Sequence, residues 1–339
     1  MPNETPSDSF LAIDIHELKR VTRDIPVDLY LKLSEDNFAH VFSKTTGLDY
    51  RRLSQYIQKG VDKLYVRKVD EAAFKDYLSR PVETLLSNPE VPKEKKIATL
   101  LNLTEQAMSE IFTRCDVLEE TAENTKKLVN NYIDMMAESP RTLSIVLKLA
   151  SHGDYLYYHS VAVSIFSMFI ARATGQFDRR MTEIVGMGGF LHDIGSIYLP
   201  REVTDAPEAL SPAQWREMKS HPKMGLRMIE HAPSIPDEVR YIVYQHHEQP
   251  NGGGYPNGLQ DEVIFYPAKI VAVADSFSAL ISKRPFRDAY RIDQAIGILQ
   301  SETGKFDPQL VEILAGIFRR SSSGTEGGAG GDTGGSEAA

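Results

Sequence analysis

The sequence predicts a mainly α-helical protein in which a helical bundle follows a small α+β domain. Residues 8–80 contain short runs where apolar and polar residues alternate, as they do in strands, whereas residues 81–320 carry apolar residues near helical spacing. The second region also holds seven residues of metal-binding type, in groups about 25 to 33 residues apart. That spacing suits one group per helix of a bundle.

Composition and charge are those of a soluble globular protein long enough for two domains. Of 339 residues, 42% are hydrophobic and 25% charged, and 38 Lys+Arg against 47 Asp+Glu give a net charge of −9. We therefore expect no tight binding of long nucleic acid, although a small anionic ligand needs only a local basic patch. The single cysteine, Cys115, excludes an internal disulfide framework and favours a reducing compartment.

Neither the start of the chain nor its most apolar stretch predicts export or membrane insertion. Residues 1–10 are polar and acidic, unlike a secretory signal. Residues 161–171 form the most apolar stretch, which is about half the length needed to cross a bilayer. The expected location is the cytoplasm.

Residues 1–80 are predicted to form the small N-terminal α+β domain. Strand-like alternation occurs at 10–15, 29–33 and 63–67, and a helix over 53–59 precedes a glycine. The segment has no cluster of chemically active residues. Its role stays open, and a regulatory role is compatible with it.

Residues 81–140 are predicted to form a helical linker or hairpin. Pro92 precedes a run of apolar residues at helical spacing over 93–116, and a second run covers 117–136. Packing in a bundle explains these stripes better than a cofactor site does. The alternative is an interaction surface, either a homodimer through helices 93–136 or a face for signalling proteins.

Residues 141–320 are predicted to be nearly all helical and to contain the functional site. From residue 321 to residue 339 the chain has nothing larger than Glu or Thr to bury, so we expect a disordered Gly/Ser-rich tail.

The candidate metal ligands include five of the nine histidines, and in chain order they are His159, His192, Asp193, His221, His246, His247 and Asp275. One isolated histidine is more often an ordinary core or surface residue, but that does not explain an ordered set with two adjacent pairs.

Adjacent residues on a helix point about 100° apart, so each pair can touch neighbouring ions, which favours a two-metal site. Asp193 has two carboxylate oxygens and can bridge both ions. Two such ions would share a hydroxide for an in-line phosphoryl displacement, with His192 and Asp193 as the catalytic pair. Imidazole-rich ligation suits iron, manganese or zinc better than magnesium.

Two nearby segments favour a phosphodiester substrate. Residues 251–258 form a Gly/Asn-rich loop, in which glycines such as Gly254 permit close approach of the backbone and Tyr255 places a hydroxyl at the edge. Residues 282–287 form a basic cluster whose arginines match phosphate oxygens. A plain surface turn and a solvated helix end remain the alternatives for these two segments.

Six segments match one set of motifs in the same order: His192-Asp193-Ile194-Gly195, His221-Pro222, His246-His247-Glu248, Gly254-Tyr255-Pro256, residues 270–280 and Arg284-Pro285-Phe286-Arg287. Together they resemble HD-GYP domains, and the resemblance covers residues 141–320. Residues 8–80 resemble, more weakly, a domain that often precedes HD-GYP domains in bacterial proteins. The resemblance implies an HD-type helical bundle carrying a dinuclear metal site. It also implies a phosphodiesterase that hydrolyses the second messenger cyclic di-GMP to the linear dinucleotide or to GMP.

Carried over residue by residue, the resemblance divides the ligands between two ions. One ion would be held by His159, His192, Asp193 and Asp275, and the other by His221, His246 and His247, with Asp193 bridging. The expected substrate-binding residues are Arg284, Arg287, Tyr255, Gly254, Lys283 and Ser196, with the arginines on phosphate. Iron is the expected metal, with manganese acceptable and zinc less favoured.

The chain departs from the HD-GYP pattern at a few positions. Ser196 stands where the family commonly has Lys, and a hydroxyl cannot supply a positive charge. Asn251 replaces the usual Asp of the loop. Tyr155 occupies the place of an acidic residue that holds a third metal in some members, so two metals are expected. These departures predict slow turnover and support one alternative, a catalytically weak cyclic di-GMP receptor or interaction module that keeps its metal site.

Overall fold

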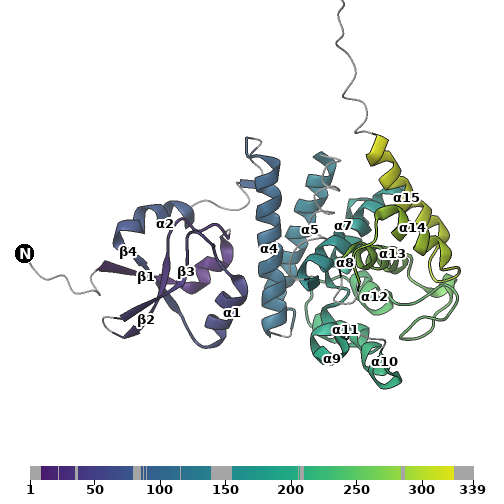
Figure 1. The fold of residues 1–339 in the computed structure, drawn as a ribbon, viewed down its shortest axis with the longest axis horizontal. Helices are drawn as coiled ribbons and strands as arrows, with labels where there is room; N and C mark the ends of the chain where they lie inside the picture. Colours follow the sequence, from purple (N-terminus) through teal and green to yellow (C-terminus); the bar gives the residue numbers. More distant parts are fainter. Residues whose placement is uncertain are drawn as a thin grey trace, which may run out of the picture. The chain divides into compact units, whose positions relative to one another are not determined.

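The chain forms two compact units, which we describe separately (Figure 1). The computed structural model describes residues 9–21, 23–34, 37–78, 85–86, 88, 90–114, 116–138, 155–204, 206, 210–283 and 287–323. The first unit comprises Met1–Tyr132 and His231–Ser234, and the second comprises Ile133–Glu230 and Ile235–Ala339. No helix in the described ranges is long and apolar enough to cross a membrane.

A four-stranded antiparallel sheet is the centre of the first unit. Its strands are β1 (Phe10–Asp14), β2 (Leu29–Ser34), β3 (Asn37–Phe42) and β4 (Lys63–Arg67), in the order β1-β4-β2-β3. The 3-10 helix η2 (Ile15–Arg20) and the helices α1 (Tyr50–Gln58) and α2 (Glu71–Leu78) accompany the sheet, so the predicted α+β domain is confirmed. The sequence predicted three of the four strands. It missed β3 because two register shifts in the β2–β3 pairing break the alternation of apolar residues.

The two helical runs predicted over residues 93–116 and 117–136 are present as α4 (Lys93–Arg114) and α5 (Glu119–Glu138). α4 packs against α1 in the first unit. The buried hydroxyls of Thr104 on α4 and Tyr132 on α5 lie 3.0 Å apart and share a hydrogen bond. Dimerisation through this helix pair stays a prediction.

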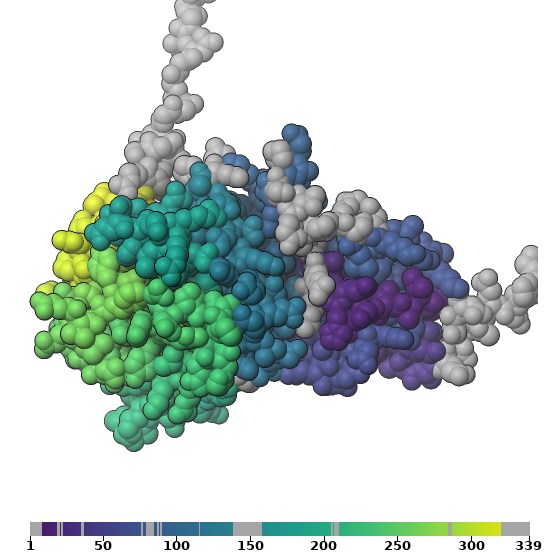
Figure 2. Space-filling view, turned by 180° about the vertical axis from the view of Figure 1, so that it is seen from behind, coloured from purple at the N-terminus to yellow at the C-terminus, as the bar shows by residue number. Residues whose placement is uncertain are grey.

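The second unit is helical, which confirms the mainly α fold class. Its central helices are α7 (Tyr155–Ala173), α8 (Arg179–Leu191) and α13 (Tyr266–Ile281), which pack against one another. Around them lie η4 (Ile194–Tyr198), α9 (Arg201–Thr204), α10 (Pro212–Met218), α11 (His221–Ile229), α12 (Asp237–Gln245), η5 (Asp261–Val263), α14 (Ile292–Ser301) and α15 (Pro308–Ser323). The rear view shows the green segments of this unit lying beside the teal ones (Figure 2).

The end of α15 corrects one predicted boundary. The helix continues to Ser323, three residues into the segment predicted as a tail, because serines can extend an established helix end at small cost. Residues 324–339 lie outside the described residues.

Two glycines in α8 set how closely its neighbours approach. A Cβ on Gly189 would lie 2.9 Å from the Ser164 Cα of α7, and one on Gly188 would lie 2.6 Å from the Ile242 side chain of α12. The Ser164 hydroxyl also donates to the Gly186 carbonyl at 2.7 Å. α8 therefore lies in direct backbone contact with α7, and its C-terminal end enters the middle of the unit.

We expect Gly189→Ala to lower the free energy of unfolding by about 1–3 kcal/mol, because the added methyl group meets the backbone of α7 rather than a flexible side chain. Urea denaturation followed by circular dichroism measures the change.

Gly297→Ala in α14 is the matched control, because no atom lies within 4 Å of the added methyl group. It should leave stability unchanged or raise it by up to about 1 kcal/mol. Equal losses in the two variants would contradict the close-packing argument.

Candidate metal centre

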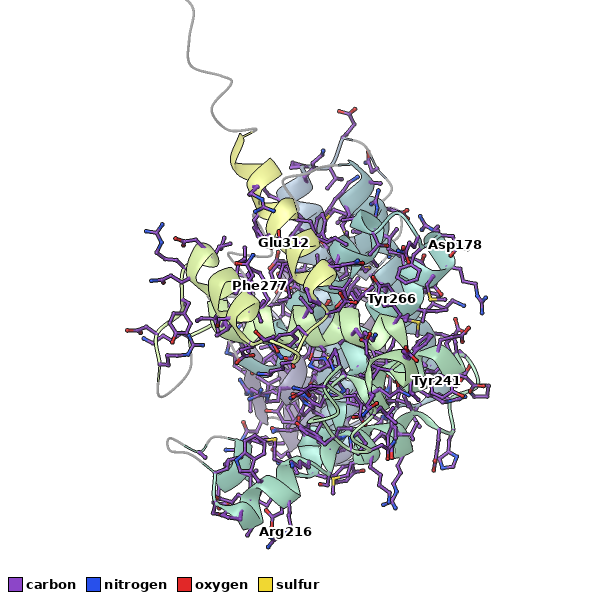
Figure 3. All side chains as sticks on the ribbon, turned by 90° about the vertical axis from the view of Figure 1, so that its right-hand side faces the viewer. Asp178, Arg216, Tyr241, Tyr266, Phe277 and Glu312 are labelled. Carbon is purple, nitrogen blue, oxygen red and sulfur yellow. The ribbon has the colours of Figure 1, made fainter. Side chains whose placement is uncertain are left out.

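All seven predicted ligands converge inside the second unit. They come from α7, the C-terminal ends of α8 and α12, the start of α11 and the middle of α13. Figure 3 shows α13 with Tyr266 at its start and Phe277 two residues beyond the ligand Asp275. The ligand atoms form three groups in which all lie within 4.8 Å of one another: His159-His192-Asp275, His192-Asp193-His246 and His221-His246-His247. The groups share His192 and His246, so the cluster is continuous.

Three of the histidines are oriented by the same backbone hydrogen bond. The Nδ1 atoms of His192, His221 and His246 each lie 2.8 Å from the carbonyl oxygen three residues earlier. A carbonyl only accepts, so each Nδ1 carries the proton and each Nε2 presents a lone pair. The fixed tautomer is the one that a metal ligand needs.

The Nε2 atoms face other acceptors rather than donors. Those of His221 and His246 lie 3.2 Å apart, and the His221 Nε2 lies 3.3 Å from an Asp193 carboxylate oxygen. Within the described part of the chain, the buried His192 Nε2 has no hydrogen-bond partner, and an Asp275 carboxylate oxygen lies 3.9 Å from it. Lone pairs that face one another in a buried site repel, and each unsatisfied acceptor costs about 1–3 kcal/mol. A bound cation removes this conflict, so the donor set fits a metal site.

His159 lies between two residues of one face of α13. Its Nε2 lies 3.1 Å from the Asp275 carboxylate, and its Nδ1 lies 3.2 Å from the Ser278 hydroxyl. Sequence reasoning missed Ser278. The available signal was a serine three residues after Asp275 in an otherwise apolar helix, a spacing that puts both side chains on one face.

Burial, together with repulsion between neighbouring rings, keeps three of the imidazoles neutral, those of His159, His246 and His247. Burial lowers the pKa of His159 despite its contact with Asp275. Burial and the neighbouring His247, His192 and His221 lower the pKa of His246 well below its usual value. For His247, burial and then His221 lower the pKa to about 3. Neutral imidazole is the form that binds metal, so the site is set for binding at neutral pH.

The pKa of Asp275 is held well below its usual range. Burial acts to raise it, but the hydrogen bond with His159 and the nearby His192 and His247 outweigh burial. Asp275 is therefore a carboxylate at neutral pH, which supplies negative charge to an otherwise imidazole-rich set.

Gly195 allows η4 to pass close to the start of α11. A Cβ on Gly195 would overlap the His221 carbonyl oxygen and the Gly225 nitrogen. This contact brings the start of η4, which directly follows Asp193, close to His221. The neighbouring Ser196 is partly buried, and its N–H donates to the Asp193 carbonyl at 3.0 Å.

The loop after α12 is held by a carboxylate that sequence reasoning did not assign. Glu248 is buried, and it accepts backbone N–H bonds from Asn257 at 2.7 Å and Leu259 at 2.8 Å. Its only signal in the sequence was its place directly after His246-His247. The carboxylate closes the loop over the end of the helix.

Gly254 and Tyr255 lie against the second half of the cluster. A Cβ on Gly254 would lie 2.6 Å from the Glu248 Cα, so the loop needs glycine there. The Tyr255 N–H donates to the His247 carbonyl at 3.1 Å, and the Tyr255 ring stacks on the His247 ring with centroids 4.6 Å apart. Burial raises the pKa of the Tyr255 phenol, which stays protonated at neutral pH and can donate a hydrogen bond. The Tyr255-Pro256 peptide is cis.

Arg287 makes its described contacts at the end of α13. Its guanidinium donates to the carbonyls of Ala279 at 2.8 Å and Leu280 at 3.0 Å, as well as to that of Asp288 at 2.9 Å. The first two bonds reach carbonyls in the last turn of α13, where helices leave carbonyls without intrahelical partners. Of the other expected substrate residues, Lys283 is exposed just beyond α13, and Arg284 lies outside the described residues.

Comparison with known proteins gives the family. A model of the HD domain matches residues 146–310. A cyclic di-GMP phosphodiesterase of Thermotoga maritima is 30% identical over 252 residues, which cover 74% of this chain and 67% of that protein. The chain belongs to the HD-GYP family.

Two further comparisons cover different shares of the chain. The solved structure of Bd1817, an HDG"Y"P protein from Bdellovibrio bacteriovorus, matches with a TM-score of 0.67 and 22% identity, covering 91% of this chain and 99% of that one. The likeness shows a shared fold. The 3'3'-cGAMP-specific phosphodiesterase 1 of Vibrio cholerae is 28% identical over 181 residues, which cover 51% of this chain and 41% of that protein. This HD-GYP chain thus matches less than half of the second relative's length.

We expect Asp193→Ala and His192→Ala to abolish metal loading while the bundle still folds, because both residues belong to the group that joins the two halves of the cluster. Elemental analysis measures metal per chain, and circular dichroism measures folding.

His40→Ala, a histidine of the other unit, is the control and should bind metal as the parent protein does. A content near two ions per chain in either site variant would show that the ligand assignment is wrong.

Lowering the pH from 7.5 to 5.5 should destabilise the metal-free protein. His247 has a pKa of about 3 when folded and about 6.5 when unfolded, so between these values the unfolded chain binds the extra proton. Stability is then lost as the pH falls below about 6.5, by on the order of 1 kcal/mol for His247 at pH 5.5.

Urea midpoints of the metal-free protein at both pH values measure this loss. His247→Gln should reduce the difference between the two midpoints, whereas His16→Gln, in the other unit, should not. An unchanged difference in His247→Gln would contradict the assignment.

Proposed function

We propose that the chain is a metal-dependent phosphodiesterase that hydrolyses cyclic di-GMP to the linear dinucleotide, to GMP, or to both. The observation that carries the proposal is the convergence of buried imidazole lone pairs and two carboxylates in one continuous cluster. The similarity to phosphodiesterases of cyclic di-GMP and of 3'3'-cGAMP supports the substrate class.

The ligands would divide between two ions. His159, His192 and Asp275 surround the first position, and His221, His246 and His247 surround the second. Asp193 belongs to a group with both His192 and His246 and lies beside His221, which supports it as the bridging ligand. Imidazole-rich ligation accepts iron, manganese and zinc, and we keep iron as the expected metal, with manganese acceptable and zinc less favoured. When bound, the ions supply an activated water and neutralise charge on the phosphate.

The chain's own residues then orient the ligands and the substrate. Backbone carbonyls hold three imidazoles in the ligating tautomer. The protonated Tyr255 hydroxyl, at the edge of the second position, is available to donate to a phosphate or leaving oxygen. His192 and Asp193 form the centre of the proposed catalytic set. Gly254, Ser196, Lys283, Arg284 and Arg287 stay in the proposed substrate-binding set.

A weakly catalytic cyclic di-GMP receptor is the second candidate, and Ser196 favours it because no cation stands at that position. The other departure from the family pattern weighs less. The Asn251 side-chain oxygen accepts the Gly253 N–H at 2.8 Å, a bond that an aspartate makes equally well. The receptor reading therefore depends on Ser196 alone.

Cleavage assays separate these candidates. Protein loaded anaerobically with Fe(II) or Mn(II) should convert cyclic di-GMP to a linear product, resolved by ion-exchange chromatography, and should do so faster than it cleaves 3'3'-cGAMP. Asp193→Ala should give no product.

Tight binding of cyclic di-GMP without product, in protein shown to hold two metals, would overturn the enzyme and leave the receptor. Preferential cleavage of 3'3'-cGAMP would keep the reaction class and correct the substrate.

A further inference from the structure

Lys219 places a positive charge at the edge of the candidate metal centre. It follows the last residue of α10 and stands two residues before the ligand His221. Its Nζ lies 5.7 Å from the centre of the Tyr255 ring. That ring stacks on His247 and meets the edge of His221, with centroids 4.6 Å and 6.3 Å away. One aromatic ring therefore separates the ammonium from two ligands of the second metal position.

The backbone that carries Lys219 is held in place. Its N–H donates to the Trp215 carbonyl at 3.0 Å, and Ser211 and Gln214 close a capping box at the other end of α10. The Gln214 amide also donates to the Glu202 carbonyl at 3.1 Å, which ties α10 to α9. The lysine thus projects from a fixed position beside His221.

The ammonium itself is available for an anion. Lys219 is exposed, and among the described residues no carboxylate forms an ion pair with it. Contact with an aromatic ring at this distance is a weak interaction for an exposed cation. A charge-assisted hydrogen bond to a phosphate oxygen is stronger, so a substrate phosphate would displace the ring as the main partner.

Other cationic candidates near the cluster are engaged or distant from its aromatic edge. Arg287 donates to two carbonyls at the end of α13 and to that of Asp288, and Lys283 makes no described contact with a cluster residue. Ser196 carries no charge. The cluster itself holds two carboxylates, Asp193 and Asp275, in a chain of net charge −9, so an anionic substrate benefits from a dedicated cation.

We propose that Lys219 binds a phosphate oxygen of the cyclic dinucleotide beside Tyr255 and supplies the positive charge that Ser196 cannot. This inference rests on the proposed function. Tyr255 then has two tasks, because its ring positions the lysine stem and its hydroxyl faces the same substrate. The contact stabilises the bound substrate and the transition state equally. Its loss should therefore raise KM and leave kcat nearly unchanged.

The chain contains a built-in probe for this test. Trp215 is the only tryptophan, is half exposed and lies one helical turn from Lys219. Its fluorescence should change when the bis-phosphorothioate analogue of cyclic di-GMP binds to the metal-loaded protein. The same emission reports whether a variant keeps α10 in place.

The experiment compares Lys219→Gln, Lys219→Arg and Lys223→Gln in metal-loaded protein. Lys223 is an exposed lysine four residues further on, with no described contact to Tyr255, so its variant controls for the loss of one charge. Lys219→Gln should raise KM for cyclic di-GMP about tenfold, the effect of one charge-assisted contact, with kcat within about twofold of the parent. The dissociation constant of the analogue should rise by the same factor. Lys219→Arg should restore most of the affinity, and the salt dependence of KM should weaken only in Lys219→Gln.

Three outcomes would overturn the inference. If Lys219→Gln matches Lys223→Gln while the parent protein cleaves cyclic di-GMP, the lysine does not bind substrate, and the proposed function stands. If Lys219→Gln loses metal or shifts the Trp215 emission without substrate, the lysine has a structural role. If the parent protein neither binds nor cleaves cyclic di-GMP, the proposed function fails and this inference fails with it.

Discussion

The bond between a histidine Nδ1–H and a carbonyl in the last turn of a helix is the interaction on which the rest of the site depends. Gly189, Met218 and Val243, which accept these bonds, lie in the last turns of α8, α10 and α12. Carbonyls at such positions have no partner within the helix. One bond therefore satisfies a helix end and points an Nε2 lone pair inward. The geometry of the cluster follows from where three helices stop.

This arrangement couples metal binding to packing. Lone pairs of His221 and His246 face each other at 3.2 Å, and the His192 Nε2 is buried without a partner. A bound cation would compensate these acceptors, so part of the binding free energy of the ion would also stabilise the fold. Glycines at 188, 189 and 195 let the backbones approach closely enough for the ligands to meet.

The sequence predicted the ligands better than the groups that hold them. Ligand identity depends on residue type and order, and both can be read along the chain, as can the helical periodicity of α4 and α5. The roles of Ser278 and Arg287 depend on tertiary contacts. Ser278 stands 119 residues from the histidine it touches, and Arg287 contacts carbonyls seven and eight residues earlier, at the end of α13, which no local pattern predicts. The strand β3 was missed for a related reason, since its bulged pairing hides the alternation.

The three carboxylates in and beside the cluster differ in the groups that face their oxygens. Both oxygens of Glu248 receive backbone N–H bonds from the loop, so this buried acid is satisfied without an ion. Asp193 and Asp275 face imidazole nitrogens instead and are the carboxylates left for a cation. Because Glu248 fixes the loop, Tyr255 stays stacked on His247, and through that ring the position of Lys219 is set as well. Glu248, whose oxygens are satisfied by the loop, thus helps to determine where a substrate phosphate would bind beside Tyr255 and Lys219.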